Sequence, residues 1–222
     1  MPRPVPRPRL GGTKAVVFDL GGVLLDLHAA EARQELITSY GISPERFDRL
    51  TRSCFTSSRR SVTERAMIGK VNTTEYLTIF CRACSRKDIE GIRQNRLSVI
   101  GSEKADVFEI ARQLREEGVT CCILSNTIAL HWERLSSRRD YPSLNSFHHV
   151  FASHLIGRAK PRKNAFSHVA NALGIRMSEC VLVDDTLVNV NGARAAGWRA
   201  VLFTDAGNLR RSLAEKTGLA IH

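Results

Sequence analysis

Five short apolar runs, most of them separated by helical patterns, restrict the folds open to this chain. The runs cover residues 15–18, 119–124, 149–152, 180–183 and 200–203. Between the first two runs, Ser102 is placed to cap a helix that carries Val107 and Leu114 and stops at Gly118. Nearly continuous apolar strands need cover on both faces. The alternation therefore predicts an α/β protein with a Rossmann-like parallel sheet and helices on both of its faces.

A long segment, residues 27–100, interrupts this alternation after the first strand. It indicates helix starts at Ser43-Pro44 and at Thr73 and contains no convincing strand. We therefore expect a small all-helical module inserted in the first crossover. The chain before the first strand is basic and proline-rich, which is typical of a disordered or polyproline-like arm. The expected organisation is an arm over 1–12, an α/β core domain over 13–26 and 101–222, and a helical domain over 27–100.

Polar side chains follow several strands of the predicted sheet, at the point where each strand ends. They are Asp19 after the first run, Ser125 and Asn126 after the second, Lys160 in the loop after the third, and Asp184 with Asp185 after the fourth. The carboxyl ends of parallel strands form the ligand-binding edge of such a sheet. Three carboxylates there repel one another unless a cation lies between them. Oxygen ligands with room for water and phosphate favour Mg²⁺.

Four motifs in this order resemble those of the haloacid dehalogenase (HAD) superfamily. They are FDLGGVLLD at 18–26, LSNT at 124–127, Lys160-Pro161, and VLVDDTLVNVNGARAAGW at 181–198. The resemblance covers nearly all of residues 14–205 and puts 27–100 in the position of the family's helical, C1-type cap. Within the superfamily, the motifs are similar to those of a subgroup typified by α-D-glucose-1-phosphatase-like enzymes.

The resemblance implies a Mg²⁺-dependent phosphatase that cleaves a small phosphomonoester, with a sugar phosphate as one candidate, through an aspartyl-phosphate. Asp19 would be the catalytic nucleophile. Lys160 would be catalytic as well, because it neutralises charge on the nucleophile and on the phosphoryl group. Ser125, Asn126 and Lys160 would bind the phosphate. The metal ligands would be Asp19, the backbone carbonyl of Gly21, Asp185, and Asp184 through water.

Two positions depart from the family pattern. Gly21 stands where many family phosphatases carry a second aspartate that acts as general acid and base. Arg162 and Lys163 follow Pro161, where an acidic residue is common in the family. The entrance to the expected site is therefore more basic than the family pattern and suits a more anionic ligand. A degenerate HAD domain with a binding or regulatory role is therefore an alternative. A 2-haloacid dehalogenase is a further one, although the Asp184-Asp185 pair argues against a metal-independent enzyme.

The net charge and the cysteines indicate which binding partners and which compartment to expect. The net charge of +11 is spread along the chain, which suits attraction of a small anionic substrate better than nucleic-acid binding. The Cys81–Cys84 pair has zinc-like spacing but no second pair, so core packing is favoured. Nothing requires disulfides, which favours a reducing cytoplasm. No apolar run approaches the roughly 20 residues of a membrane span. A homodimer is one candidate assembly.

Overall fold

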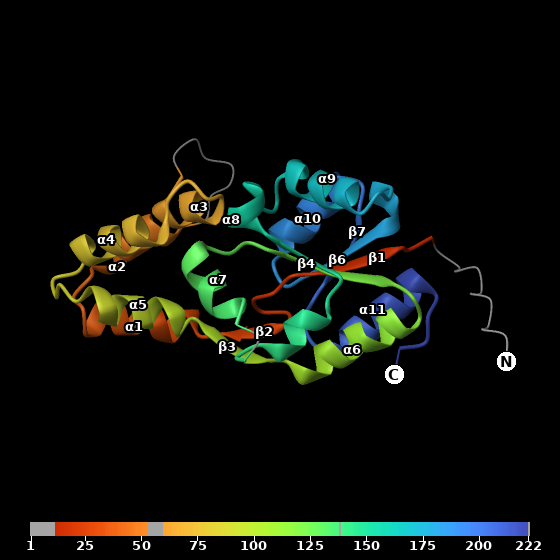
Figure 1. Cartoon of the computed structure of the whole chain (residues 1–222), viewed down its shortest axis with the longest axis horizontal. Helices are drawn as coiled ribbons and strands as arrows, with labels where there is room; N and C mark the ends of the chain where they lie inside the picture. Colours follow the sequence, from red (N-terminus) through yellow and green to blue (C-terminus); the bar gives the residue numbers. More distant parts are fainter. Residues whose placement is uncertain (1–11, 53–59, 138, 222) are drawn as a thin grey trace.

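The central sheet has five parallel strands in the order β5–β4–β1–β6–β7 in the computed structural model, which describes residues 12–52, 60–137 and 139–221. Its strands are β1 (Ala15–Phe18), β4 (Thr120–Ser125), β5 (His149–Ala152), β6 (Cys180–Asp184) and β7 (Arg199–Leu202). Each predicted strand is present, and its bounds differ from the expected ones by at most one residue. Every residue of β1 is fully buried, because β1 lies at the centre of the sheet with helices on both sides (Figure 1).

Two pairs of helices cover the two faces of the sheet. Helices α6 (Ala105–Glu116) and α11 (Ala206–Thr217) lie on one face, and α9 (Lys163–Ala172) and α10 (Leu187–Ala195) lie on the other (Figure 1). Successive strand residues point to opposite faces. Val16 and Phe18 therefore pack in the α6–α11 core, whereas Val17 packs in the α9–α10 core. The predicted Rossmann-like α/β fold is confirmed.

Shorter elements connect these layers. They are α7 (Ala129–Leu135), α8 (Ser153–Ile156) and the 3₁₀ turns Pro142–Ser146 and Met177–Glu179. Residues 1–11 of the predicted basic arm lie outside the described residues.

A two-stranded antiparallel ribbon joins the sheet to the inserted segment. It pairs β2 (Leu25–Leu27) with β3 (Ile100–Glu103). The predicted role of Ser102 as a helix cap is therefore wrong: Ser102 lies in β3 and its hydroxyl donates to Asp26 at 2.9 Å. The helix begins at Ala105 instead, after Lys104, which forms no side-chain cap. The ribbon also places strand residues at both ends of a segment that was expected to be wholly helical.

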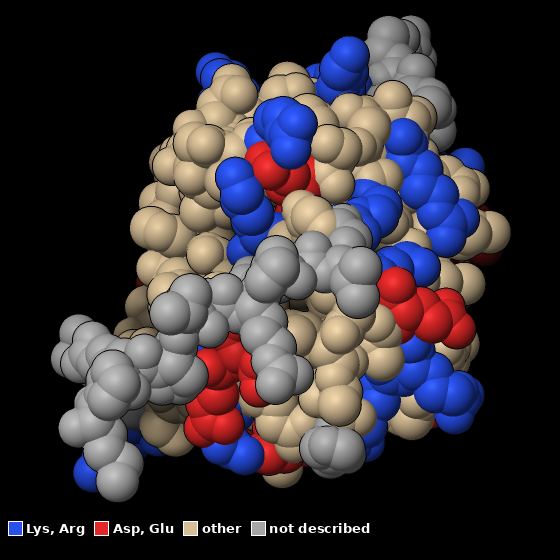
Figure 2. All heavy atoms as spheres, turned by 90° about the vertical axis from the view of Figure 1, so that its right-hand side faces the viewer, with Lys and Arg blue, Asp and Glu red and all other residues tan. Residues whose placement is uncertain are grey.

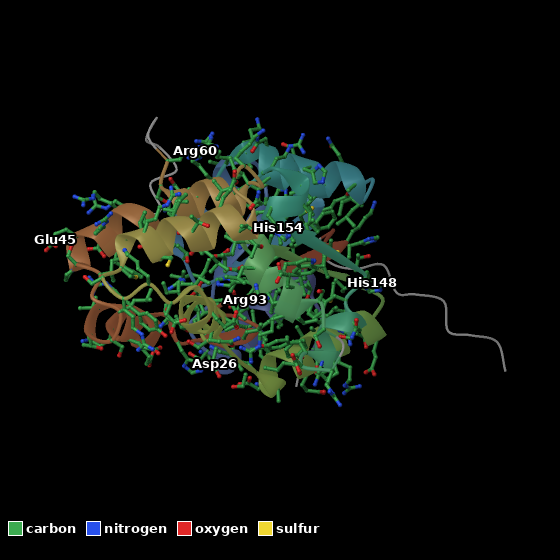
Figure 3. All side chains as sticks on the ribbon, turned by 60° about the vertical axis from the view of Figure 1, so that its left-hand side comes forward. Asp26, Glu45, Arg60, Arg93, His148 and His154 are labelled. Atoms are coloured by element: carbon green, nitrogen blue, oxygen red, sulfur yellow. The ribbon has the colours of Figure 1, made fainter. Side chains whose placement is uncertain are left out.

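The described residues between β2 and β3 form five helices, at the left of the sheet in Figure 1. They are α1 (Ala29–Thr38), α2 (Pro44–Thr51), α3 (Val62–Met67), α4 (Thr73–Ala83) and α5 (Ile89–Leu97). Figure 3 turns them toward the viewer, with Glu45 of α2 at the outer end. The start of α2 at Pro44, with Ser43 as its cap, and that of α4 at Thr73 agree with the sequence-based expectation.

The inserted helices pack around a hydrophobic core in which Leu36, Phe47, Phe80 and Ile92 are buried, and Ile128 and Leu130 at the start of α7 complete it. Cys84 is part of this core and Cys81 packs against it, as expected from their helical spacing.

Within the described residues, no helix is long and apolar enough to cross a membrane. On the face shown in Figure 2, lysines and arginines form several separate groups with acidic residues between them.

Candidate active site

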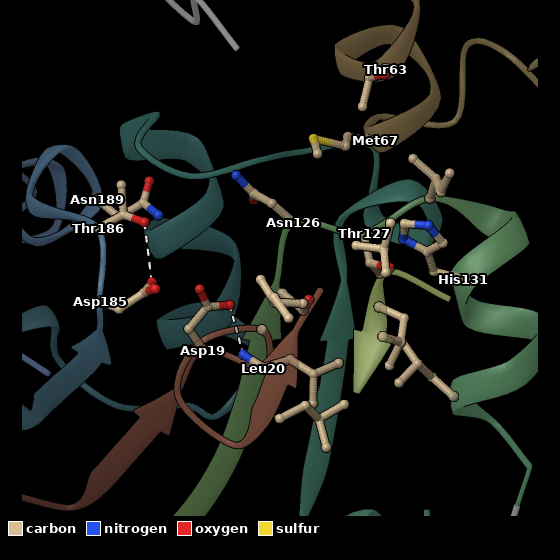
Figure 4. A pocket seen from close by; sticks show the side chains of 18 of the residues that line it. Asp19, Leu20, Thr63, Met67, Asn126, Thr127, His131, Asp185, Thr186 and Asn189 are labelled. Carbon is tan, nitrogen blue, oxygen red and sulfur yellow. Dashed lines mark hydrogen bonds between the residues drawn. The ribbon is translucent and has the colours of Figure 1, made fainter. Parts of the chain in front are cut away.

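Most of the polar strand-end residues predicted from the sequence border one cavity at the carboxyl edge of the sheet, whereas Lys160 and Asp184 are buried and do not line it. Its volume is about 590 Å³, and Asp19, Gly21, Ser125, Asn126 and Asp185 are among the residues that line it. Figure 4 shows Asp19 and Asp185 on the sheet side of the cavity, with Thr63 and Met67 of α3 on the opposite side. The cavity therefore lies between the α/β core and the inserted helices.

Lys160 is fully buried and joins two carboxylates. Its Nζ lies 2.9 Å from Asp19 Oδ1 and 2.6 Å from Asp184 Oδ2. Asn126 fixes the backbone of this lysine, because its Nδ2 donates to the Lys160 carbonyl and its Oδ1 accepts from the Lys160 N–H, both at 2.9 Å. Asn126 thus holds in place a loop that follows it by more than 30 residues.

Asp184 is also fully buried, and its carboxylate accepts hydrogen bonds from three residues. Besides Lys160, the donors are the Thr186 N–H at 2.9 Å and Asn189 Nδ2, at 3.0 Å from Oδ1 and 3.2 Å from Oδ2. A buried charge is tolerated when it is paired and hydrogen-bonded in this way. Asp184 is therefore a fixed negative charge beneath the cavity.

Burial and charge shift the proton affinities of the ion pair. Burial raises the pKa of Asp19 to about 7, and the negative charge of Asp184 adds to this rise, whereas Lys160 opposes it. Burial on its own would lower the pKa of Lys160, but the two carboxylates outweigh it and raise that pKa. Lys160 therefore stays charged, and further positive charge near Asp19 would favour its ionised form.

The carboxylates of Asp19, Asp184 and Asp185 form a set that fits a divalent cation. One oxygen from each lies within 4.8 Å of the others. When all three are ionised, they carry three negative charges against the single positive charge of Lys160, and a divalent cation would balance the cluster. Hard oxygen donors of this kind suit Mg²⁺. Among the described residues, this is the one such group of His, Cys, Asp or Glu side chains.

Gly22 allows the loop after β1 to approach this cluster. Its φ is +81°, and a Cβ built at this position would lie 2.1 Å from Asp185 Oδ2. Lys104 holds the same loop from below, because its Nζ donates to the Gly22 carbonyl at 2.9 Å. The two glycines after Asp19 thus have different surroundings: the nearest neighbour of a Cβ at Gly21 would be the side chain of Leu27, at 3.0 Å.

The structure brings the predicted site residues together and adds contacts that the sequence did not indicate. Asn189 Nδ2 donates to the Asp184 carboxylate and so supports the loop that carries Asp185. Ser153 was not singled out, yet its buried hydroxyl accepts from the Thr127 N–H at 3.0 Å and donates to the Thr127 carbonyl at 3.1 Å. The residues of the inserted helices that line the cavity were missed as well, because no motif or periodicity marks them.

Residues 13–197 match the family of haloacid dehalogenase-like hydrolases. The chain belongs to this family. Phosphatase MT3486 of Mycobacterium tuberculosis is 27% identical over 203 residues, which cover 88% of this chain and 89% of that protein. The sesquiterpene phosphatase astK of Aspergillus oryzae is 26% identical over 197 residues, which cover 87% and 91% of the two chains. The expectation of a hydrolase of the HAD superfamily is thus confirmed.

Solved structures share this fold. A HAD family enzyme from Bacteroides thetaiotaomicron, in complex with magnesium and inorganic phosphate, superposes with a TM-score of 0.72 at 20% identity. The match covers 88% of this chain and 96% of that one. A predicted HAD-like family hydrolase from Porphyromonas gingivalis reaches a TM-score of 0.75 at 23% identity, with 91% and 97% covered. At these identities the likeness establishes the fold of this HAD hydrolase.

Proposed function

We propose that this HAD hydrolase is a Mg²⁺-dependent phosphatase that cleaves small phosphomonoesters through an aspartyl-phosphate on Asp19. The observation that carries the proposal is a buried lysine bound to Asp19 and Asp184, with Asp185 completing a carboxylate cluster at the cavity floor. The two relatives named as phosphatases and the solved enzyme bound to magnesium and phosphate support it.

In this proposal the reaction has two displacements on phosphorus. A carboxylate oxygen of Asp19 attacks the phosphorus, the ester P–O bond breaks, and the leaving oxygen takes up a proton. Water then attacks the phosphorus of the aspartyl-phosphate, which releases inorganic phosphate and restores Asp19. Lys160 orients Asp19 and neutralises charge that accumulates on the phosphoryl oxygens.

Other residues of the site would bind the phosphoryl group and the metal. The Ser125 hydroxyl lines the cavity, and Asn126 Nδ2 has a second N–H besides the one donated to Lys160. The Ser125 hydroxyl and this second N–H of Asn126 are assigned to hydrogen bonds with phosphoryl oxygens. Asp19, the Gly21 carbonyl and Asp185 would hold Mg²⁺, with Asp184 acting through water. When bound, the ion supplies positive charge that stabilises the transferring phosphoryl group.

The lining of the cavity favours an organic group that is more apolar than a sugar. Apart from the site residues, its walls include Leu20, Leu25, Val99, Ile100, Ile128 and Leu135. Apolar walls of this kind stabilise a bound organic group mainly by removing apolar surface from water. We therefore propose a substrate with an apolar body attached to the phosphate, in preference to the sugar phosphate considered from the sequence.

A phosphate-release assay tests this function. Aryl, alkyl, sugar and acyl phosphates are incubated with the protein, with and without Mg²⁺. The Asp19→Asn variant should lose at least about 10³-fold in kcat, the scale seen when a member of a catalytic unit is removed. Its circular dichroism spectrum should match that of the wild type. Comparable turnover in the variant would contradict the role of Asp19, and the absence of turnover on every ester would favour a degenerate domain.

A further inference from the structure

An arginine of the inserted helices is buried beside the cavity without an acidic partner. Arg96 lies in α5, is 7% exposed and lines the same cavity as Asp19. Among the residues that the structure describes, no carboxylate forms an ion pair with it. Buried charges in proteins are usually paired. An unpaired buried guanidinium therefore requires an explanation.

Aromatic rings occupy the faces of the guanidinium but leave its edge unsatisfied. The Arg96 Cζ lies 5.4 Å from the ring centre of Phe80 and 5.8 Å from that of Phe47. These contacts stabilise the cation through its π faces. The N–H donors point outward in the guanidinium plane, and buried Nε and Nη1 have no hydrogen-bond partner. The rings thus hold the cation in place without satisfying its donors.

Further residues that line the same cavity have a buried hydroxyl oxygen without a hydrogen-bond partner. They are Thr63, Tyr76 and Thr127. The Tyr76 ring lies 4.7 Å from that of Phe80, so Tyr76 and Arg96 both flank this phenylalanine. Each unsatisfied buried donor or acceptor destabilises the free protein. Several such groups around one cavity are expected where a ligand supplies the missing partners.

The neighbouring histidine, His131, does not add a second positive charge beside Arg96. His131 Nε2 lies 2.9 Å from the Arg96 carbonyl, and because a carbonyl can only accept, this nitrogen carries the proton. Burial, together with the charge of Arg96, lowers the pKa of His131 to about 3. His131 is therefore neutral, and among the described residues that line the cavity Arg96 is the one with a positive charge.

We propose that the substrate carries a second anionic group, a carboxylate, at the far end of its apolar body, and that Arg96 binds it. The inference rests on the proposed phosphatase function, since the phosphate of the same molecule lies at Asp19. Tyr76 donates a further hydrogen bond to the carboxylate. The substrate class is thus a phosphomonoester of an apolar hydroxy acid. A cavity of about 590 Å³ lies within the range of ligand sites of this size.

Matched substrates test the inference separately from the phosphatase function. The substrates are ω-phosphonooxy alkanoates of four to eight carbons and alkyl phosphates of the same lengths, which lack the carboxylate. For at least one length, wild-type kcat/KM should favour the acid by about 10–100-fold, the contribution of a charge-assisted hydrogen-bonded pair. p-Nitrophenyl phosphate reports on the phosphatase function alone. Turnover of all these esters with no preference for the acids would overturn the inference and leave the function intact.

Variants assign the preference to Arg96. Arg96→Met should bring the ratio of acid to alkyl phosphate close to one, and Tyr76→Phe, which keeps the ring, should lower it by roughly 3–10-fold. The control is Arg93→Met on the same helix, where the arginine pairs with Glu133 at 2.8 Å and does not line the cavity. This variant should keep the wild-type ratio. An unchanged ratio in Arg96→Met would contradict the assignment.

Two measurements do not require turnover. Calorimetric titration of the same acids and alkyl phosphates into the Asp19→Asn protein should show the same preference, and its absence would overturn the inference even in a protein that hydrolyses nothing. The Tm of ligand-free Arg96→Met should exceed that of wild type by roughly 2–6 °C, because an unsatisfied buried cation is removed. A Tm well below that of Arg93→Met would show instead that Arg96 serves the fold.

Discussion

Replacing Gly21 with aspartate should provide the proton donor that the site lacks. Gly21 lies two residues after Asp19 and lines the cavity. A Cβ at this position would lie 3.0 Å from Leu27 Cδ1 and 3.1 Å from Cδ2, both at the end of a side chain on a residue that is 45% exposed. Leu27 can move at a cost on the order of 1 kcal/mol. We therefore expect the variant to fold with its loop geometry preserved.

The gain in rate depends on the leaving group. General acid catalysis typically contributes about 10²–10⁴-fold, or about 3–5 kcal/mol of barrier. A phenol loses its proton near pH ~10, as tyrosine does, so phenolate can leave without help. An aliphatic alcohol is about as weak an acid as water, with a pKa near ~16. Gly21→Asp should thus raise kcat/KM for benzyl phosphate by about 10²-fold, the lower end of that range. Phenyl phosphate should change by only a few-fold.

The assay compares kcat/KM for phenyl and benzyl phosphate, which are similar in size, in three proteins. Wild type should favour phenyl phosphate strongly. The difference in kcat/KM between the two esters should narrow in Gly21→Asp but persist in Gly21→Asn, because asparagine has the size of aspartate and no acidic proton. Equal values for the two esters in the wild type would show that another group or bound water protonates the leaving oxygen. An identical ratio in the Asp and Asn variants would refute the reasoning as well.

Four other perturbations test separate parts of the site. Removal of metal with EDTA should abolish turnover, and Asp185→Ala should raise the Mg²⁺ concentration needed for half-maximal rate; a full rate of phosphate release after EDTA treatment would contradict the requirement for Mg²⁺. Gly22→Ala should destabilise the fold by about 1–3 kcal/mol more than Gly157→Ala in urea unfolding. Both glycines have a positive φ, but an added Cβ would clash with Asp185 at Gly22 and would meet no atom within 4 Å at Gly157. The lowered pKa of His131, about 3 against 6.5, predicts that stability falls as the pH drops below 6.5, since the unfolded chain then binds a proton that the folded chain does not. His131 changes the free energy of unfolding by at most about 1.4 kcal/mol per pH unit. Urea unfolding from pH 4 to 7 should show a smaller dependence of this free energy on pH in His131→Gln than in the wild type.

The sheet and the location of the site were predictable because both depend on local patterns. Apolar runs determine which segments become buried strands, and in a parallel sheet all strand ends on one side meet at one edge. Asp19 and Asp184 could therefore be placed together from their positions after such runs. Ser102 was misassigned because serine, a common helix cap, is followed here by two more residues before the helix begins.

Contacts between distant segments could not be predicted in the same way. The pairing of Asn126 with the backbone of Lys160 depends on how two loops meet, and no spacing in the sequence encodes it. Arg96 lies in the segment IEGIRQNRL, which is mostly polar and is typical of a solvent-exposed helix. Its burial arises only when α5 packs beside α4 and presents Arg96 to Phe80. Such packing is a property of the assembled tertiary structure.

The pairing of β2 with β3 has a consequence for how this enzyme can diverge. The chain leaves the core along one strand and returns along its antiparallel neighbour, so the two ends of the helical insert stay together whatever lies between them. Insertions whose ends are adjacent in space are well tolerated by a host domain. Changes within α1–α5 can thus reshape the upper wall of the cavity while Asp19, Lys160 and Asp184 keep their mutual distances. Substrate choice and bond-breaking are in this way open to separate selection.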